Sequence, residues 1–144
     1  HIGLGTFKPL SSENIKNNSL HSEIFNVPKE AVNAINRTKR EGGRVISVGT
    51  TTLRAIESAC KFNNGLLKPC SGETDLFIYP GYKFMIADSL ITNFHLPKSS
   101  LFILVCAFGG YEKMKSSYQH AIKKKYRFYS YGDAMFVNLE SNNL

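Results

Sequence analysis

The first half of the chain alternates strand-like and helix-like stretches, and this order constrains the fold most. Residues 20–27 (LHSEIFNV) alternate as a half-buried strand does, and a helix is expected from Pro28 to Gly42. Residues 44–49 (RVISVG) are almost continuously apolar, which predicts a strand covered on both faces, and a second helix follows over residues 51–61. The order predicts an α/β fold, a layered mixed or mostly parallel sheet flanked by helices.

The second half predicts shorter elements, with a buried helix over 101–108 at its centre. The helix over 111–125 is expected to bury one face formed by Tyr111, Met114, Tyr118 and Ile122. The remaining expectations are a turn-rich stretch around Gly72, strands over 74–79 and 88–92, a hairpin of 126–131 with 134–137 around Gly132 and Asp133, and a flexible tail over 138–144.

Length and charge limit the possible classes of protein. The chain has 144 residues, about one domain, and a net charge of +7, which favours an anionic partner such as nucleic acid. Its three cysteines fit neither a zinc motif nor a disulfide framework, so we expect no metal and a reduced, cytoplasmic setting. The apolar runs are too short to span a membrane, so no membrane partner is expected.

The segment TNFHLPKSS, residues 92–100, is the strongest candidate for chemistry. It places Asn93, His95 and Lys98 in one short loop before the buried helix, with Ser99 or Ser100 as the helix cap. One interpretation is that Asn93 and His95 present donors and acceptors to a substrate at that helix N-terminus. The other is that they satisfy buried backbone groups around a tight turn.

The segment VGTTTLR, residues 48–54, joins a predicted strand to a predicted helix. Free backbone N–H groups beside Gly49, Thr50, Thr51 and Thr52 form a natural anion site, and an anion would offset the unfavourable position of Arg54 in the first turn. The alternative is a threonine N-cap with Arg54 paired to Glu57.

Three further groups are weaker candidates. His21 and Glu23 share one face of a strand and form either an acid–base pair or an edge ion pair. Gly3 and Gly5 indicate close approach of the backbone to a ligand or another strand. The segment YRFYSYGD, residues 126–133, follows Lys123, Lys124 and Lys125, and offers aromatic faces for a base and Arg127 for a phosphate; the alternative is a core strand behind a solvated lysine face.

Taken together and in order, these motifs closely resemble one enzyme family. HIGLGTFKP, HSEIFNVP, RVISVGTTTLRAIES, TDLFIYPGYKF, LITNFHLPKSSLFILVCAFGG and YRFYSYGDAMFV are similar to the C-terminal part of S-adenosylmethionine:tRNA ribosyltransferase-isomerases of queuosine biosynthesis. The resemblance covers residues 1–137. It implies the C-terminal part of an α/β catalytic domain, a fragment without the β-barrel domain that interrupts the longer family members.

The resemblance also implies an activity. Family members transfer and isomerise the ribosyl group of S-adenosylmethionine, a co-substrate, onto 7-aminomethyl-7-deazaguanine in tRNA, giving epoxyqueuosine and releasing adenine and methionine. A monomer is expected for the full-length enzyme.

Within that chemistry we assign hypothetical roles. His95 and Asn93 are the first candidates for proton transfer and positioning, followed by His21 and Glu23. The substrate-binding candidates are Gly3, Gly5, Gly49, Thr50, Thr51, Thr52, Arg54, Tyr131 and Asp133, and the tRNA-binding candidates are Lys98, Lys123, Lys124, Lys125 and Arg127. The competing class is a non-catalytic tRNA- or nucleotide-binding module of the same fold.

Overall fold

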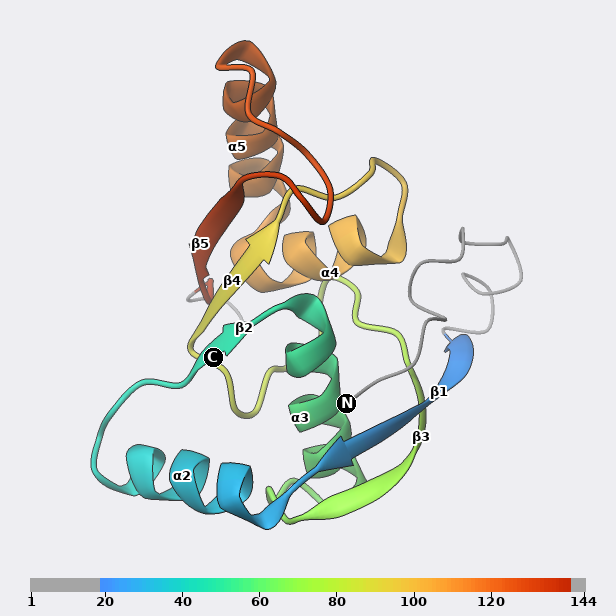
Figure 1. Cartoon of the computed structure of the whole chain (residues 1–144), viewed down its shortest axis with the longest axis vertical. Coiled ribbons are helices and arrows are strands. Elements are labelled where there is room, and N and C mark those ends of the chain that lie inside the picture. The colour runs from blue at the N-terminus through green and yellow to red at the C-terminus, as the bar shows by residue number, and fades with distance from the viewer. Residues whose placement is uncertain (1–18, 141–144) are drawn as a thin grey trace.

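A computed structural model describes residues 19–140, and these residues form two small sheets with helices packed between and beside them (Figure 1). Sequence candidates that precede residue 19, including Gly3 and Gly5, lie outside the described residues. The elements are β1 (Ser19–Val27), α2 (Lys29–Arg40), β2 (Ile46–Val48), α3 (Thr50–Phe62), β3 (Cys70–Leu76), β4 (Ser89–Asn93), α4 (Ser100–Gly109), α5 (Tyr111–Lys123) and β5 (Ala134–Asn138).

Strand β4 is the centre of a mixed three-stranded sheet. It pairs in parallel with β2, with Val48 opposite Ile91, and antiparallel with β5, with Leu90 opposite Val137. Helices α3 and α4 contact this sheet, and the α/β prediction is confirmed. The described part of the chain buries Ser47, Leu90 and Val137 on one face of this sheet.

The prediction that β2 is covered on both faces is wrong. Ile46 and Val48 are 43% and 64% exposed, and Phe136 of β5 is 51% exposed. Within residues 19–140 the helices pack on the opposite face of this sheet, so these apolar side chains stay open to solvent.

Strands β1 and β3 form a separate antiparallel pair, and here the turn predicted around Gly72 is wrong. Gly72 lies inside β3 opposite Phe25, and the strand ends at Leu76 rather than Tyr79. A Cβ atom at Gly72 would lie 3.3 Å from the ring of Phe62. The glycine therefore permits close packing against α3 instead of making a turn.

The two C-terminal helices lie where the sequence predicts them, but one predicted face differs. Helix α4 is apolar on nearly all sides and buried, and α5 buries Met114, Tyr118 and Ala121. Tyr111 and Ile122 are 53% and 65% exposed, against expectation. The middle turns of α5 make the packing contacts, so its first and last apolar residues remain outside.

The predicted hairpin of 126–131 with 134–137 is also wrong. Residues 126–133 form an irregular loop, called here the 126–133 loop, and β5 pairs with β4 instead. The backbone N–H of Tyr129 donates to the carbonyl of Phe94 at 2.9 Å, which fastens the loop beside the end of β4. Residues 126–131, predicted to pair with β5, thus form part of a loop beside the sheet.

The predicted tail begins too early. Asn138 belongs to β5, and the backbone N–H groups of Leu139 and Glu140 donate to Asp88 and Phe108 at 3.1 and 3.0 Å. Residues 141–144 lie outside the described part of the chain.

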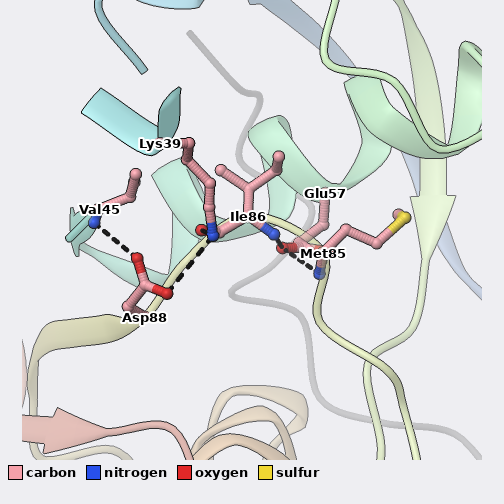
Figure 2. A network of polar contacts seen from close by, with 6 residues as sticks. All are labelled: Lys39, Val45, Glu57, Met85, Ile86 and Asp88. Atoms are coloured by element: carbon pink, nitrogen blue, oxygen red, sulfur yellow. Dashed lines mark hydrogen bonds and ion pairs between the residues drawn. The ribbon is translucent and has the colours of Figure 1, made fainter. Parts of the chain in front are cut away.

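A polar network aligns β4 beside β2 (Figure 2). Buried Glu57 of α3 accepts hydrogen bonds from the backbone N–H groups of Met85 and Ile86 at about 3.1 Å. Asp88 accepts from the backbone N–H of Val45 at 2.7 Å, and Lys39 donates to the carbonyl of Ile86 at 2.9 Å. Burial raises the pKa of Glu57, and the hydrogen bonds from the Met85 and Ile86 N–H groups partly offset that rise. The segment leading into β4 is thereby tied to both α3 and β2.

Candidate functional site

A cavity of about 390 Å³ lies where the two parallel strands end. Its volume is within the range of roughly 300–1,000 Å³ that is usual for small-ligand pockets. In α/β proteins this is the edge of the sheet at which ligands bind. Three segments line this cavity, called here the pocket: Gly49, Thr50 and Thr51; Thr92, Asn93, His95, Leu96, Pro97, Lys98, Ser99 and Leu101; and Tyr129 and Ser130.

The N-terminus of α3 forms one wall of the pocket. Gly49 is the N-cap, with φ 92° and ψ 142°, a conformation that is essentially restricted to glycine. No side chain in the described part of the chain caps this end, so the alternative of a threonine N-cap is wrong. The N–H groups of the first turn and the positive end of the helix dipole therefore favour an anion here.

His95 is fixed at two points. Its Nε2 atom lies 2.8 Å from the hydroxyl of Thr92, and its backbone N–H donates to the hydroxyl of Tyr118 at 3.0 Å. Burial lowers the pKa of His95 to about 4 and raises the pKa of Tyr118 to about 12. At neutral pH the imidazole is therefore uncharged. It can donate one hydrogen bond and accept another without placing a positive charge in the pocket.

Asn93 joins the end of β4 to the 126–133 loop. Its amide nitrogen donates to the carbonyl oxygens of Asp133 and Gly132 at 3.2 and 3.4 Å. The amide therefore binds backbone carbonyls at the wall of the pocket, but these belong to a distant loop and not to the tight turn that one of the two interpretations expected.

Two residues of the pocket hold an unusual backbone conformation. Lys98 has φ 60° and Tyr129 has φ 70°, the left-handed region that costs a non-glycine residue roughly 1–2 kcal/mol. Ser99 caps α4 by accepting from the N–H of Phe102 at 3.1 Å, and its own hydroxyl donates to the carbonyl of Leu96 at 2.7 Å. Strain of this kind is concentrated at functional sites.

Arg54 does not line the pocket. Its Nη1 lies 2.7 Å from Oε2 of Glu23, and its Nε donates to the carbonyl of Leu76 at 3.1 Å. Both side chains of the ion pair are almost fully buried, at 1% and 2% exposure. The expected Arg54–Glu57 pair is wrong, because Arg54 extends toward β1 while Glu57 binds the backbone near Ile86.

The 126–133 loop is closed by its own charged residues. The carboxylate of Asp133 accepts from the backbone N–H of Arg127 at 2.7 Å and from its guanidinium at 3.0 Å. This hydrogen bonding lowers the pKa of Asp133. Tyr131 is 98% exposed, next to Ser130 at the rim of the pocket.

The structure brings six of the predicted residues together at the pocket, namely Gly49, Thr50, Thr51, Asn93, His95 and Lys98. Thr52 is exposed on the first turn of α3, outside the pocket lining, and Lys123, Lys124 and Lys125 are exposed at the end of α5. His21 lies on β1, and its side chain is outside the described structure.

Sequence reasoning placed Thr92, Tyr129 and Ser130 within candidate segments without giving them roles, and it missed Tyr118. Thr92 stands three residues before His95, a spacing that a turn after the strand brings within hydrogen-bond distance. Tyr118 comes from a distant helix, and no local signal links it to His95.

Neither a metal cluster nor a membrane-spanning helix occurs within residues 19–140. No group of three or more His, Cys, Asp or Glu side chains there is arranged to hold a metal ion. In the same part of the chain, no helix combines the length and apolar character needed to cross a membrane.

The fold is an α/β domain with a cavity of small-ligand size at the ends of its parallel strands. The chain belongs to the queuosine biosynthesis protein family, whose model matches residues 1–137. It is 61% identical over 143 residues, 99% of its length, to the S-adenosylmethionine:tRNA ribosyltransferase-isomerase of Vesicomyosocius okutanii. The crystal structure of S-adenosylmethionine tRNA ribosyltransferase from Thermotoga maritima matches 79% of the chain with a TM-score of 0.73 and 45% identity.

The chain spans about two fifths of these relatives, 41% of the first and 40% of the second. These matches confirm the resemblance to the family.

Proposed function

We propose that this chain forms the S-adenosylmethionine-binding part of a tRNA ribosyltransferase-isomerase. In the reaction, the ribosyl group of S-adenosylmethionine moves to 7-aminomethyl-7-deazaguanine in tRNA and is isomerised to give epoxyqueuosine. Adenine and methionine leave. A cytoplasmic setting, a monomeric full-length enzyme and the absence of a metal remain part of this proposal.

One observation carries the proposal. The pocket is lined by residues from 49–51, 92–101 and 129–130, three segments that belong to separate sequence motifs. Their convergence on one cavity of ligand size is what a shared binding site requires.

The N-terminus of α3 is suited to the carboxylate of the methionine portion. Thr50 and Thr51 line the pocket at the positive end of the helix dipole. Arg54, a sequence candidate for this group, is engaged with Glu23, so the helix amides are the donors that we assign to the carboxylate. A tRNA phosphate is the competing anion at this site.

His95 and Asn93 are the first candidates for proton transfer and positioning. The sulfonium acidifies the adjacent 5′ carbon, and the departing adenine benefits from a donor. An imidazole whose pKa is lowered to about 4 is uncharged at neutral pH and does not repel the positive sulfonium. The second candidate pair for proton transfer is His21 and Glu23. Because Glu23 forms an ion pair with Arg54, we keep His21 as the candidate from this pair.

The exposed lysines and the 126–133 loop are suited to the tRNA. Lys123, Lys124 and Lys125 lead directly into this loop, whose Tyr129 and Ser130 line the pocket. Arg127 is exposed, so a phosphate can compete with Asp133 for its guanidinium. Lys98 adds a positive charge at the pocket itself, and Tyr131 offers an exposed ring for stacking on a base.

Adenine release tests the proposal. The chain, alone and joined to the remaining part found in its longer relatives, is incubated with S-adenosylmethionine and tRNA carrying 7-aminomethyl-7-deazaguanine, and adenine is separated by chromatography. We expect adenine from the joined form and a loss of two or more orders of magnitude in His95→Ala, the range of general acid–base catalysis. The exposed His120→Ala is the matched control.

The outcomes separate the enzyme from the alternative. If the joined form retains tRNA but releases no adenine, the non-catalytic tRNA- or nucleotide-binding module is the better description. Near-normal turnover in a folded His95→Ala protein would remove His95 from the proton-transfer assignment.

A further inference from the structure

The contact between the Thr92 hydroxyl and the His95 imidazole fixes the orientation of the ring. Thr92 lies on β4, is 4% exposed and contributes to the pocket wall. Its hydroxyl oxygen lies 2.8 Å from Nε2 of His95. This ring nitrogen is therefore turned toward the strand, and Nδ1 is the ring nitrogen left to meet a ligand.

The direction of this hydrogen bond follows from the chemistry of the two groups. Among the described residues, His95 is the hydrogen-bond partner of the Thr92 hydroxyl. A hydroxyl that only accepted from Nε2 would leave its own buried O–H without a partner, at a cost of roughly 1–3 kcal/mol. A hydroxyl that donates leaves only oxygen lone pairs unfilled, which is less costly. Thr92 is thus the donor and Nε2 the acceptor.

We propose that Thr92 is a positioning residue that holds His95 in the tautomer with hydrogen on Nδ1, so that the imidazole presents an N–H donor to the pocket. The ligand that it meets rests on the proposed function, and is an acceptor atom on the nucleoside of S-adenosylmethionine. Which nitrogen carries the single hydrogen of a neutral histidine is set by the partner of the other nitrogen.

The main chain at His95 is held separately. Its backbone N–H donates to the hydroxyl of Tyr118 at 3.0 Å, and the ring of Tyr118 packs on Phe94 and Phe102 with centroids 5.3 and 4.8 Å away. Tyr118 therefore fixes where the loop lies, whereas Thr92 fixes which ring nitrogen is protonated. The two effects are separable by mutation.

Of the two roles proposed above for His95, this assignment favours positioning over proton transfer. A neutral imidazole with hydrogen on Nδ1 donates a hydrogen bond and stabilises negative charge that develops on the nucleoside as adenine departs. It does not give up that hydrogen, since the product would be an imidazolate. Removal of the proton from the 5′ carbon then falls to another group.

Nitrogen NMR of the histidine side chains tests the tautomer directly. In the chain labelled with ¹⁵N at histidine, the His95 signals are assigned by their loss in His95→Gln. We expect one nitrogen-bound hydrogen, on Nδ1, at neutral pH. In Thr92→Val the hydrogen is expected to shift largely to Nε2, and Thr92→Ser should keep it on Nδ1. Tyr118→Phe is the control, because it removes the backbone hydrogen bond but leaves Thr92 in place.

A wild-type spectrum with the hydrogen on Nε2 overturns the proposal, even if Thr92→Val fails to fold. A folded Thr92→Val protein with an unchanged tautomer overturns it as well. This readout needs no turnover, so it stands apart from the test of the proposed function. In the joined enzyme, kcat for adenine release should fall roughly 10- to 100-fold in Thr92→Val with little change in KM, as when other orienting partners are removed, and Thr92→Ser should restore it.

Discussion

Arg54 and Glu23 form a buried ion pair that links α3 to β1, with 2.7 Å between Nη1 and Oε2. Helix α3 is also the helix whose first residues line the pocket. A charge that looks like a ligand for an anion in the sequence is therefore a structural link between α3 and the β1–β3 sheet, on the same helix whose first turn lines the pocket.

Breaking this pair should destabilise the fold strongly. Removing one partner leaves the other charge buried, so Arg54→Met and Glu23→Gln should each lower the free energy of unfolding by roughly 3–5 kcal/mol. The double replacement should cost less than the sum of the two. Urea unfolding measures all three, with Lys113→Gln in the exposed Lys113–Glu140 pair as the control, expected to cost about 1 kcal/mol or less. Additive losses would show that the two charges are not coupled.

Gly49 should be needed for both stability and ligand binding. A side chain at its φ of 92° is strained, so Gly49→Ala should cost roughly 1–3 kcal/mol and shift the first turn of α3. Gly65→Ala is the matched control, because Gly65 has φ 87° and lies outside the pocket lining. Both variants should lose stability, but only Gly49→Ala should weaken S-adenosylmethionine binding in calorimetry. Equal affinities in the two variants would argue against an anion site at α3.

The buried imidazole predicts a specific pH dependence of stability. Burial lowers the pKa of His95 from 6.5 to about 4, so between these values the unfolded chain binds more protons than the folded one. Stability contributed by neutral His95 is present above pH 6.5 and is lost as the pH falls toward 4, by roughly 3 kcal/mol in total. His95→Gln should remove this part of the pH dependence, and exposed His120→Gln should not. Parallel pH curves for wild type and His95→Gln would show that His95 titrates normally.

Exposed lysines at the end of α5 should determine the salt dependence of tRNA binding. Lys123→Gln with Lys124→Gln should weaken binding and lower the slope of log K against log salt by about 1 for each phosphate that is no longer neutralised. The control pair is Lys61→Gln with Lys68→Gln, which removes the same charge from the last turn of α3 and the segment after it. If the two pairs have the same effect, net charge alone explains the binding.

The sequence predicted the α/β order well because its strongest signals are local. The apolar residues of α2 and α3, the glycine after α2 and the apolar run of α4 place these helices within a few residues of their predicted bounds. Strand pairing was harder to predict. Residues 126–131 have the composition of a strand, yet they belong to the 126–133 loop. Hydrogen bonds from Tyr129 to Phe94 and from Asn93 to Asp133, each joining residues more than thirty positions apart in sequence, hold this loop in place.

For the candidate site, too, residues marked by local sequence were predicted, and residues whose partners lie elsewhere were not. His95, Asn93 and Gly49 are marked by their position at strand and helix ends, and the structure places all three at the pocket. Arg54 was misassigned because its partner on β1 is 31 residues away, and the turn that brings Thr92 to His95 was not recognised. Gly3 and Gly5 stay predictions, since they lie outside the described residues.

The place where S-adenosylmethionine binds on this chain is the most direct test of the proposed function. Backbone amide signals of the ¹⁵N-labelled protein are followed as S-adenosylmethionine is added, with methionine and adenosine added separately for comparison. We predict the largest shift changes at Gly49, Thr50, Thr51 and His95, with methionine alone affecting the α3 end. Changes confined to another surface, such as the groove of α2 beside Asn33 and Arg37, would contradict the proposed site.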